Sequence, residues 1–307
     1  MQEEVAIGTR PATSQDLDLR GMRHHVLTWG DAAAPKLFLI HGWMDVGASF
    51  QFLVDAFVHE WHVIAPDLRG FGRTQWQPQG YWFHDYIADL EALVDHFAPP
   101  GERINLAGHS LGGNIVMSYA GVRPERIARL VSLDGFGIPD ESPAKAAGKT
   151  AKWLDALKSP PAWKPYRDLD AVADRLQQNN PRLPRDKARF LAAHWATVRP
   201  DGQAELVSDP RHRLPFPTVY RMEEIIRLWN AIAAPTLWVA AAETHLLQWL
   251  DPANNPTGRE ANFDGIRARL AHIQGARLEI VSGAGHMLHH DRPAAVARLI
   301  ESFFTAG

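Results

Sequence analysis

Five consecutive residues form the pattern in this chain that most directly suggests chemistry: Gly108-His109-Ser110-Leu111-Gly112, which matches G-x-S-x-G. An apolar run at 104–107 precedes it and a helical pattern at 111–121 follows it. Between a strand and a helix, this motif makes a sharp turn that exposes the serine hydroxyl above the sheet edge. Glycine at both ends of the motif removes side chains that would collide across the turn. We therefore predict that Ser110 is a nucleophile, with the N-terminal amides of the next helix aimed at the reacting centre.

A serine hydroxyl is a weak nucleophile unless a base takes its proton. The best candidate is His286 in Gly283-Ala284-Gly285-His286, which follows the apolar run at 277–281. A residue after this last predicted strand should lie at the same sheet edge as Ser110. We predict that His286 is the general base.

Acyl transfer also needs donors for a developing oxyanion. His41-Gly42-Trp43 follows the apolar run at 37–40, so the backbone N–H of Trp43 can join that of Leu111 in this role. We assign His41, Gly42 and His109, beside these donors, to substrate binding. Trp195 is the more distant residue that we expect to face the substrate.

The elements that must position these residues alternate between strands and helices. This rhythm predicts an α/β fold, with a mostly parallel sheet and helices on both of its faces. The predicted elements are a hairpin at 15–30 with Gly21 at its turn, strands at 37–40, 63–65, 104–107, 130–133, 236–240 and 277–281, and helices at 49–59 (with Ser49 as N-cap), 83–97, 111–121 and 293–304.

The alternation of strands and helices is interrupted over residues 138–230, here called the cap segment. It is rich in Pro, Arg, Trp and Ala, contains no strand candidate, and fits short helices at 144–158, 168–178 and 185–198. It is far longer than an ordinary connection between a strand and a helix. We predict a helical cap, or lid, inserted into a core made of residues 1–137 and 231–307.

Composition limits the possible partners. The 307 residues carry a net charge of −3, with no basic bias toward nucleic acid. The absence of cysteine excludes disulfides, thiolate metal sites and cysteine nucleophiles. The start of the chain lacks a signal-peptide pattern, and no run of 18 apolar residues predicts a membrane span. We expect a cytoplasmic monomer or homodimer that acts on a small molecule.

No cofactor or metal is expected. His286, His289, His290 and Asp291 cluster in sequence, but no H-E-x-x-H pattern or other ligand spacing accompanies them.

Four motifs occur in an order that resembles the α/β-hydrolase superfamily, over about residues 15–305. They are His41-Gly42-Trp43, the tract 66–72, Gly108 to Gly113, and Gly285-His286. The resemblance implies a serine hydrolase with the chain order Ser, acid, His. It also implies that Asp67 and Arg69 hold the loop 66–72 and take no part in the chemistry.

The resemblance leaves the catalytic acid open. Most members of the superfamily place an Asp after the strand that follows the cap; Thr244 stands at that position here, one residue after Glu243. Some cap-bearing members carry the acid after the earlier strand, where this chain has Asp134 followed by Gly135. Either carboxylate could fix the tautomer of His286 and stabilise its imidazolium. Asp134 is our first choice and Glu243 the alternative.

Three functions fit these residues. The first is hydrolysis of a small carboxylic ester through an acyl-enzyme. The second keeps the same triad but cleaves a C–C bond, a lactone or an amide, or transfers an acyl group, because fold alone does not decide the reaction. The third is a non-catalytic ligand-binding protein on this fold. Dehalogenase and epoxide-hydrolase chemistry is disfavoured, because those relatives carry Asp where this chain has Ser110.

Overall fold

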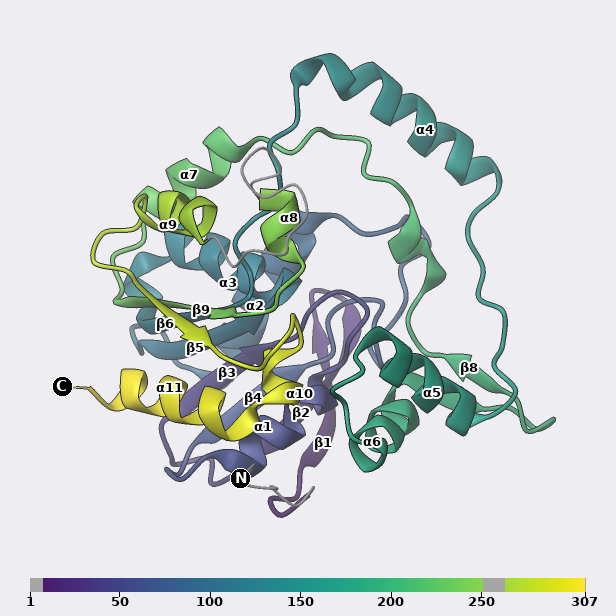
Figure 1. The fold of residues 1–307 in the computed structure, drawn as a ribbon, viewed down its shortest axis with the longest axis horizontal. Coiled ribbons are helices and arrows are strands. Elements are labelled where there is room, and N and C mark those ends of the chain that lie inside the picture. Colours follow the sequence, from purple (N-terminus) through teal and green to yellow (C-terminus); the bar gives the residue numbers. More distant parts are fainter. Residues whose placement is uncertain (1–7, 251–262, 307) are drawn as a thin grey trace.

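A computed structural model describes residues 8–250 and 263–306 and places an eight-stranded, twisted sheet at the centre of the chain (Figure 1). The first two strands pair antiparallel, β2 pairs antiparallel with β4, and the remaining pairs are parallel. In spatial order the strands are β1 (Thr13–Leu19), β2 (Met22–Trp29), β4 (His62–Pro66), β3 (Lys36–Ile40), β5 (Ile104–His109), β6 (Ile127–Leu133), β9 (Thr236–Ala241) and β10 (Arg277–Val281).

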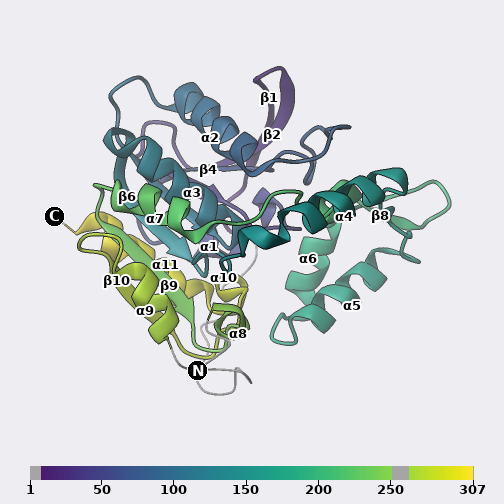
Figure 2. The same cartoon turned by 90° about the horizontal axis from the view of Figure 1, so that it is seen from above.

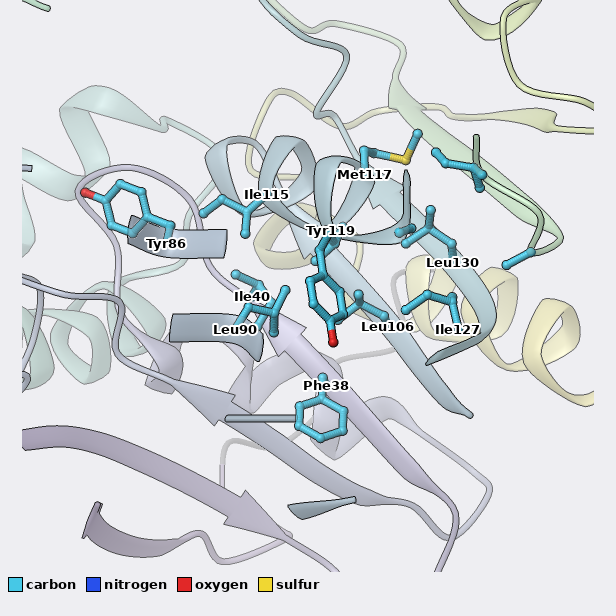
Figure 3. Close-up of a cluster of buried hydrophobic side chains, with 14 of the residues drawn as sticks. Phe38, Ile40, Tyr86, Leu90, Leu106, Ile115, Met117, Tyr119, Ile127 and Leu130 are labelled. Carbon is cyan, nitrogen blue, oxygen red and sulfur yellow. The ribbon is translucent and has the colours of Figure 1, made fainter. Parts of the chain in front are cut away.

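The central strands are mainly apolar because both sheet faces are covered. Successive side chains of a strand point to opposite faces, so Phe38 and Ile40 pack in one hydrophobic cluster while Leu37 and Leu39 pack in the other. Helices α2 (Phe83–Phe97), α3 (Leu111–Val122) and α9 (Asp264–Leu270) cover the first face. Helices α1 (Gln51–Ala56) and α11 (Pro293–Thr305) cover the second. Figure 3 shows the first cluster, where side chains of β3 and β5 meet those of α2 and α3.

The predicted fold class is confirmed, and most predicted elements agree with the structure to within a few residues. The prediction for residues 49–59 is wrong in detail. A 3₁₀ helix, η1 (Gly47–Phe50), precedes α1, and the side chain of Ser49 caps no helix. Its hydroxyl donates instead to Asp45 at 2.8 Å.

The chain between β6 and β9 leaves the sheet and arches beside it (Figures 1 and 2). Helices α5 and α6 form a small cluster of their own, which packs on Phe52 of α1. The elements of this segment are η3 (Pro143–Lys145), α4 (Ala146–Lys158), α5 (Leu169–Asn179), α6 (Arg185–Trp195), β7 (Ala196–Val198), β8 (Ala204–Leu206), η4 (Pro210–Arg213) and α7 (Met222–Asn230).

One expectation about the cap segment needs correction. The segment contains an antiparallel strand pair, β7 and β8, where a helix to residue 198 and no strand were predicted. Asp201-Gly202 is a hairpin signal, and Gly202 has the positive φ (84°) that such a turn requires. The domain boundary predicted at residue 230 falls at the end of helix α7. Helix α7 packs on α3 of the core, and the ring of its Trp229 lies 5.2 Å from that of Trp238 in β9.

Residues 1–7, 251–262 and 307 belong to the predicted core but lie outside the described residues, as does the N-terminal stretch used to exclude a signal peptide. In the two described ranges, no helix combines the length and the apolar character needed to cross a membrane.

Candidate active site

The turn between β5 and α3 holds Ser110 in a conformation that an L-residue rarely adopts, with φ 53° and ψ −114°. Close backbone packing keeps it there. A Cβ atom on Gly108 would lie 2.3 Å from the carbonyl oxygen of Gly112, and one on Gly112 would lie 2.0 Å from that of Ile40. Strain of this kind persists only where the surroundings enforce it. It lifts the hydroxyl out of the helix and toward the sheet's C-terminal edge.

The loops after three parallel strands bring Ser110, His286 and Asp134 into one hydrogen-bonded line. Nε2 of His286 lies 3.0 Å from Oγ of Ser110. On the other side of the ring, Nδ1 lies 2.7 Å from Oδ2 of Asp134. Because Asp134 is fully buried, its carboxylate meets the imidazole away from water. This geometry can move a proton from a serine hydroxyl to an imidazole whose charged form a carboxylate stabilises.

Two further groups orient the Asp134 carboxylate. The hydroxyl of Thr244 donates to Oδ2 at 2.5 Å, and the backbone N–H of Ala241 donates to Oδ1 at 3.1 Å. Thr244 was not among the predicted site residues. Its position was the available signal, since it stands where most of the superfamily carry the acid.

Glu243, the alternative candidate acid, has a different partner. Its carboxylate is half exposed and pairs with the guanidinium of Arg182 in the cap segment. Of the two candidate acids, the structure therefore brings Asp134, and not Glu243, to His286.

The loop after β3 lies against Ser110. A Cβ atom on Gly42 would lie 2.9 Å from Nδ1 of His109 and 3.1 Å from Cβ of Ser110, so a larger residue here would displace its neighbours. Among the described residues, no acceptor takes the backbone N–H of Trp43 or Leu111. Both residues line the cavity that contains Ser110. Two unpaired donors beside a nucleophile are the arrangement that an oxyanion hole requires.

His41 and Gly42, which were predicted to bind substrate, are both buried, and neither lines the cavity. Nδ1 of His41 donates to the carbonyl of Gly42 at 2.7 Å, and Nε2 accepts the N–H of Leu68 at 2.8 Å. Burial lowers the pKa of His41 to about 4, against the opposing influence of Asp67 and the Gly42 carbonyl. This neutral imidazole therefore ties two loops together.

His109 lines the cavity but is almost fully buried. Its Nε2 donates to the backbone carbonyl of His286 at 2.8 Å. Burial, reinforced by His289 and His286, holds the pKa of His109 well below the usual value. The neutral ring therefore positions the loop that carries His286. His245 was not among the predicted site residues, yet its ring lies 4.9 Å from that of His286.

A cavity of about 2450 Å³ opens over Ser110 and His286, with the core on one side and the cap segment on the other. Trp195 lines it as predicted, and its indole N–H donates to Oδ1 of Asp45 at 3.3 Å. The lining is predominantly apolar, and tryptophans contribute to it from both sides. They are Trp43, Trp82, Trp153, Trp163, Trp195, Trp229 and Trp249.

Beside the catalytic line, the described residues contain one group of side chains that could hold a metal ion: Asp45, His289 and His290. All three are buried. Burial raises the pKa of Asp45 to about 7, even though Ser49 and neighbouring donors oppose the change. Burial also holds the pKa values of both histidines well below the usual value.

Comparison with known proteins defines the class. Residues 35–293 match the family described as the alpha/beta hydrolase fold, so this chain belongs to that family and is an α/β-hydrolase.

Particular relatives are more distant. The chain is 23% identical to a serine hydrolase-like protein of Danio rerio over 93% of its own length and 85% of the relative's. It is 27% identical to a 3-hydroxybutyrate-oligomer hydrolase of Cupriavidus necator, covering 94% of each chain. Among solved structures, the thioesterase domain from the curacin biosynthetic pathway aligns with a TM-score of 0.83 at 24% identity, covering 95% of this chain and 99% of that one. This last likeness concerns the fold alone.

Proposed function

We propose that this α/β-hydrolase is a serine hydrolase that cleaves carboxylic esters through an acyl-enzyme. One observation carries the proposal: the continuous hydrogen-bonded line from Oγ of Ser110 through His286 to the buried Asp134. The similarity to a 3-hydroxybutyrate-oligomer hydrolase supports an ester as the substrate, because hydroxybutyrate units are joined by ester bonds.

In the first half of the reaction, Oγ of Ser110 attacks the ester carbonyl while Nε2 of His286 takes the hydroxyl proton. Asp134 stabilises the imidazolium that results. The backbone N–H groups of Trp43 and Leu111 hold the negative carbonyl oxygen. When the tetrahedral intermediate collapses, His286 gives its proton to the leaving alkoxide, which departs as the alcohol.

In the second half, a water molecule attacks the acyl-serine and His286 takes one of its protons. Collapse of the second intermediate releases the carboxylic acid, and His286 returns the proton to Oγ of Ser110. The chain thus ends in its starting state, with one ester bond and one water molecule converted into an acid and an alcohol.

We further propose that the cap segment, up to the start of α7, covers the substrate. Its Trp195 lines the cavity opposite the core, and the pair between Arg182 and Glu243 joins the segment to the loop after β9. The cavity volume exceeds the roughly 300–1,000 Å³ of common small-molecule sites. We therefore extend the expected substrate from a small ester to one with a bulky or long apolar group.

Labelling with a fluorophosphonate tests the proposal without a guess about the substrate. The intact mass of the protein should rise by one adduct, because an activated serine attacks the probe's phosphorus. The Ser110→Ala variant should take up none. Ser302→Ala is the matched control, since Ser302 is an exposed serine on α11, and it should label like the natural chain.

Turnover of p-nitrophenyl butanoate gives the second measurement. Ser110→Ala should lower kcat by at least about 10³-fold, with KM little changed. A folded natural chain that neither labels nor hydrolyses any ester would overturn the esterase proposal in favour of a ligand-binding protein.

A further inference from the structure

A buried group of potential metal ligands lies under the loop that follows β3. Asp45 comes from this loop, and His289 and His290 come from α10 (Leu288–Asp291). One donor atom from each residue can be chosen so that all three lie within 4.8 Å of one another. The exposed fractions of the three residues are 2%, 0% and 2%, so water does not surround these polar side chains.

Several donor atoms in this group have no hydrogen-bond partner among the described residues. They are both ring nitrogens of His289 and Nε2 of His290. Buried polar atoms are almost always paired, and leaving one unpaired costs about 1–3 kcal/mol. A neutral imidazole has one lone-pair nitrogen, so unpaired nitrogens on two adjacent rings indicate a bound cation that accepts one lone pair from each ring.

The third member of the group is already fixed in place. Oδ1 of Asp45 accepts the N–H of Val46 at 2.9 Å and the indole N–H of Trp195 at 3.3 Å. Oδ2 accepts the hydroxyl of Ser49 at 2.8 Å. Hydrogen bonds of this kind orient the carboxylate ligands of metal sites.

The donor set selects a class of ion. Two imidazole nitrogens and one carboxylate oxygen suit Zn²⁺ better than Mg²⁺ or Ca²⁺, which prefer oxygen ligands alone. Nε2 of His289 lies 3.9 Å from Oδ2 of Asp45. Bond lengths near 2.1 Å place two ligands of a tetrahedral zinc ion about 3.4 Å apart. A small inward movement of the side chains would therefore form the site.

We propose that Asp45, His289 and His290 form a Zn²⁺-binding site, with its open coordination position toward the substrate cavity. The direction follows because Asp45 and His290 line that cavity while His289 does not. This proposal does not depend on the proposed ester hydrolysis. It differs from the expectation of no metal site, which considered the histidines near residue 290 without the distant Asp45. Asp291, included in that earlier cluster, instead accepts hydrogen bonds from Asn180 and the N–H of Gly285.

Isothermal titration of the chelator-treated full chain with ZnCl₂ tests the site. The natural chain should bind one ion. Asp45→Asn, His289→Gln and His290→Gln keep much of the side-chain shape but weaken the donor set, and each should raise Kd by at least about tenfold. His272→Gln removes an exposed histidine away from the site and should leave Kd unchanged.

The His286→Gln variant distinguishes zinc bound at this site from zinc bound by His286 beside Ser110. Zinc affinity that survives His286→Gln and falls in the three ligand variants supports the proposal. No binding to the natural chain, unchanged affinity in the ligand variants, or affinity lost only in His286→Gln each overturns it.

A second measurement decides the matter if the ligand variants fail to fold. Co²⁺ added to His286→Gln should give the strong visible d–d absorption of a four- or five-coordinate ion, and excess Zn²⁺ should abolish it. A spectrum of aqueous, six-coordinate Co²⁺ from the folded protein overturns the proposal.

Discussion

At the scale of single residues, Thr244 and Asp134 together explain how this chain can lack the usual acid and still present a carboxylate to His286. The Thr244 hydroxyl reaches Oδ2 of Asp134, the same oxygen that faces Nδ1 of His286. The loop after β9 thus supplies a neutral donor where most relatives supply the charge.

We expect the two candidate acids to respond very differently to loss of charge. Asp134→Asn should lower kcat for p-nitrophenyl butanoate by about 10⁴-fold, because an amide stabilises neither the required tautomer nor the imidazolium of His286. Glu243→Gln should change kcat by less than about threefold, since it removes only a half-exposed ion pair. Steady-state kinetics with circular dichroism as a folding check makes the comparison. The opposite order of effects would make Glu243 the acid.

At the scale of elements, two side chains hold the loop after β4 beside the site. Asp67 accepts the N–H of Gly47 at 2.8 Å, which joins this loop to η1. Arg69 makes two bonds of 2.5 Å to Asp89 of α2, with both side chains buried. These contacts agree with the positioning role that the resemblance implied for Asp67 and Arg69.

Arg69→Met should destabilise the fold without touching the reacting groups. Removing one partner of a buried ion pair leaves the other charge poorly compensated, which costs about 3 kcal/mol of unfolding free energy. Arg123→Met breaks a more exposed pair with Glu91 and should cost at most about 1 kcal/mol. Urea unfolding at pH 7 compares the two variants. Equal losses of unfolding free energy in the two variants would show that burial does not increase the contribution of the pair between Arg69 and Asp89.

The ion pair between Arg69 and Asp89 also predicts that the stability of the fold depends on pH. Burial alone would raise the pKa of Asp89, but the nearby ring of His24 and the two bonds from Arg69 outweigh it and lower the pKa to about 2. The unfolded value is near 3.9. A depressed pKa adds stability above the unfolded value and loses it as the pH falls toward 2. The difference between the natural chain and Arg69→Met should therefore be constant above about pH 5 and shrink below pH 4.

The elements that sequence predicted well are those with a strong, local signal. Buried strands such as β3 and β5 carry short apolar runs, and α2 repeats its apolar residues at helical spacing. The strands β7 and β8 have three residues each, too few for a periodic pattern. The site residues with a local signal were also predictable, because Ser110 and His286 lie in recognisable turns.

Roles that depend on distant contacts could not be predicted. The role of Asp45 depends on its contacts with Trp195 and His289, and the role of Thr244 depends on its hydrogen bond to Asp134. His41 shows the reverse case, because its place in a motif suggested substrate contact while the folded chain buries it.

At the scale of the whole molecule, the cavity belongs to neither part of the chain alone. The core supplies Ser110, His286 and Trp43, and the cap segment supplies Trp153, Trp195 and much of the opposite wall. Tyr81 of the core donates to Asp209 of the cap segment at 2.8 Å, and Trp76 donates to the carbonyl of Val207 at 2.9 Å. These bonds hold residues 207–209 of the cap segment on the core.

The size of this cavity predicts how activity depends on the acyl chain. Each methylene that moves from water to an apolar wall contributes about 0.8 kcal/mol, which is up to about fourfold in kcat/KM if the transition state keeps the contact. For p-nitrophenyl esters we expect kcat/KM to rise from the butanoate to the decanoate, below the micelle-forming concentration of each ester. Trp195→Ala should flatten this rise, because Trp195 is part of the wall. A steep fall beyond the butanoate would mean that only a small part of the cavity beside Ser110 receives the acyl group, and the small ester of the sequence analysis would then be the better description.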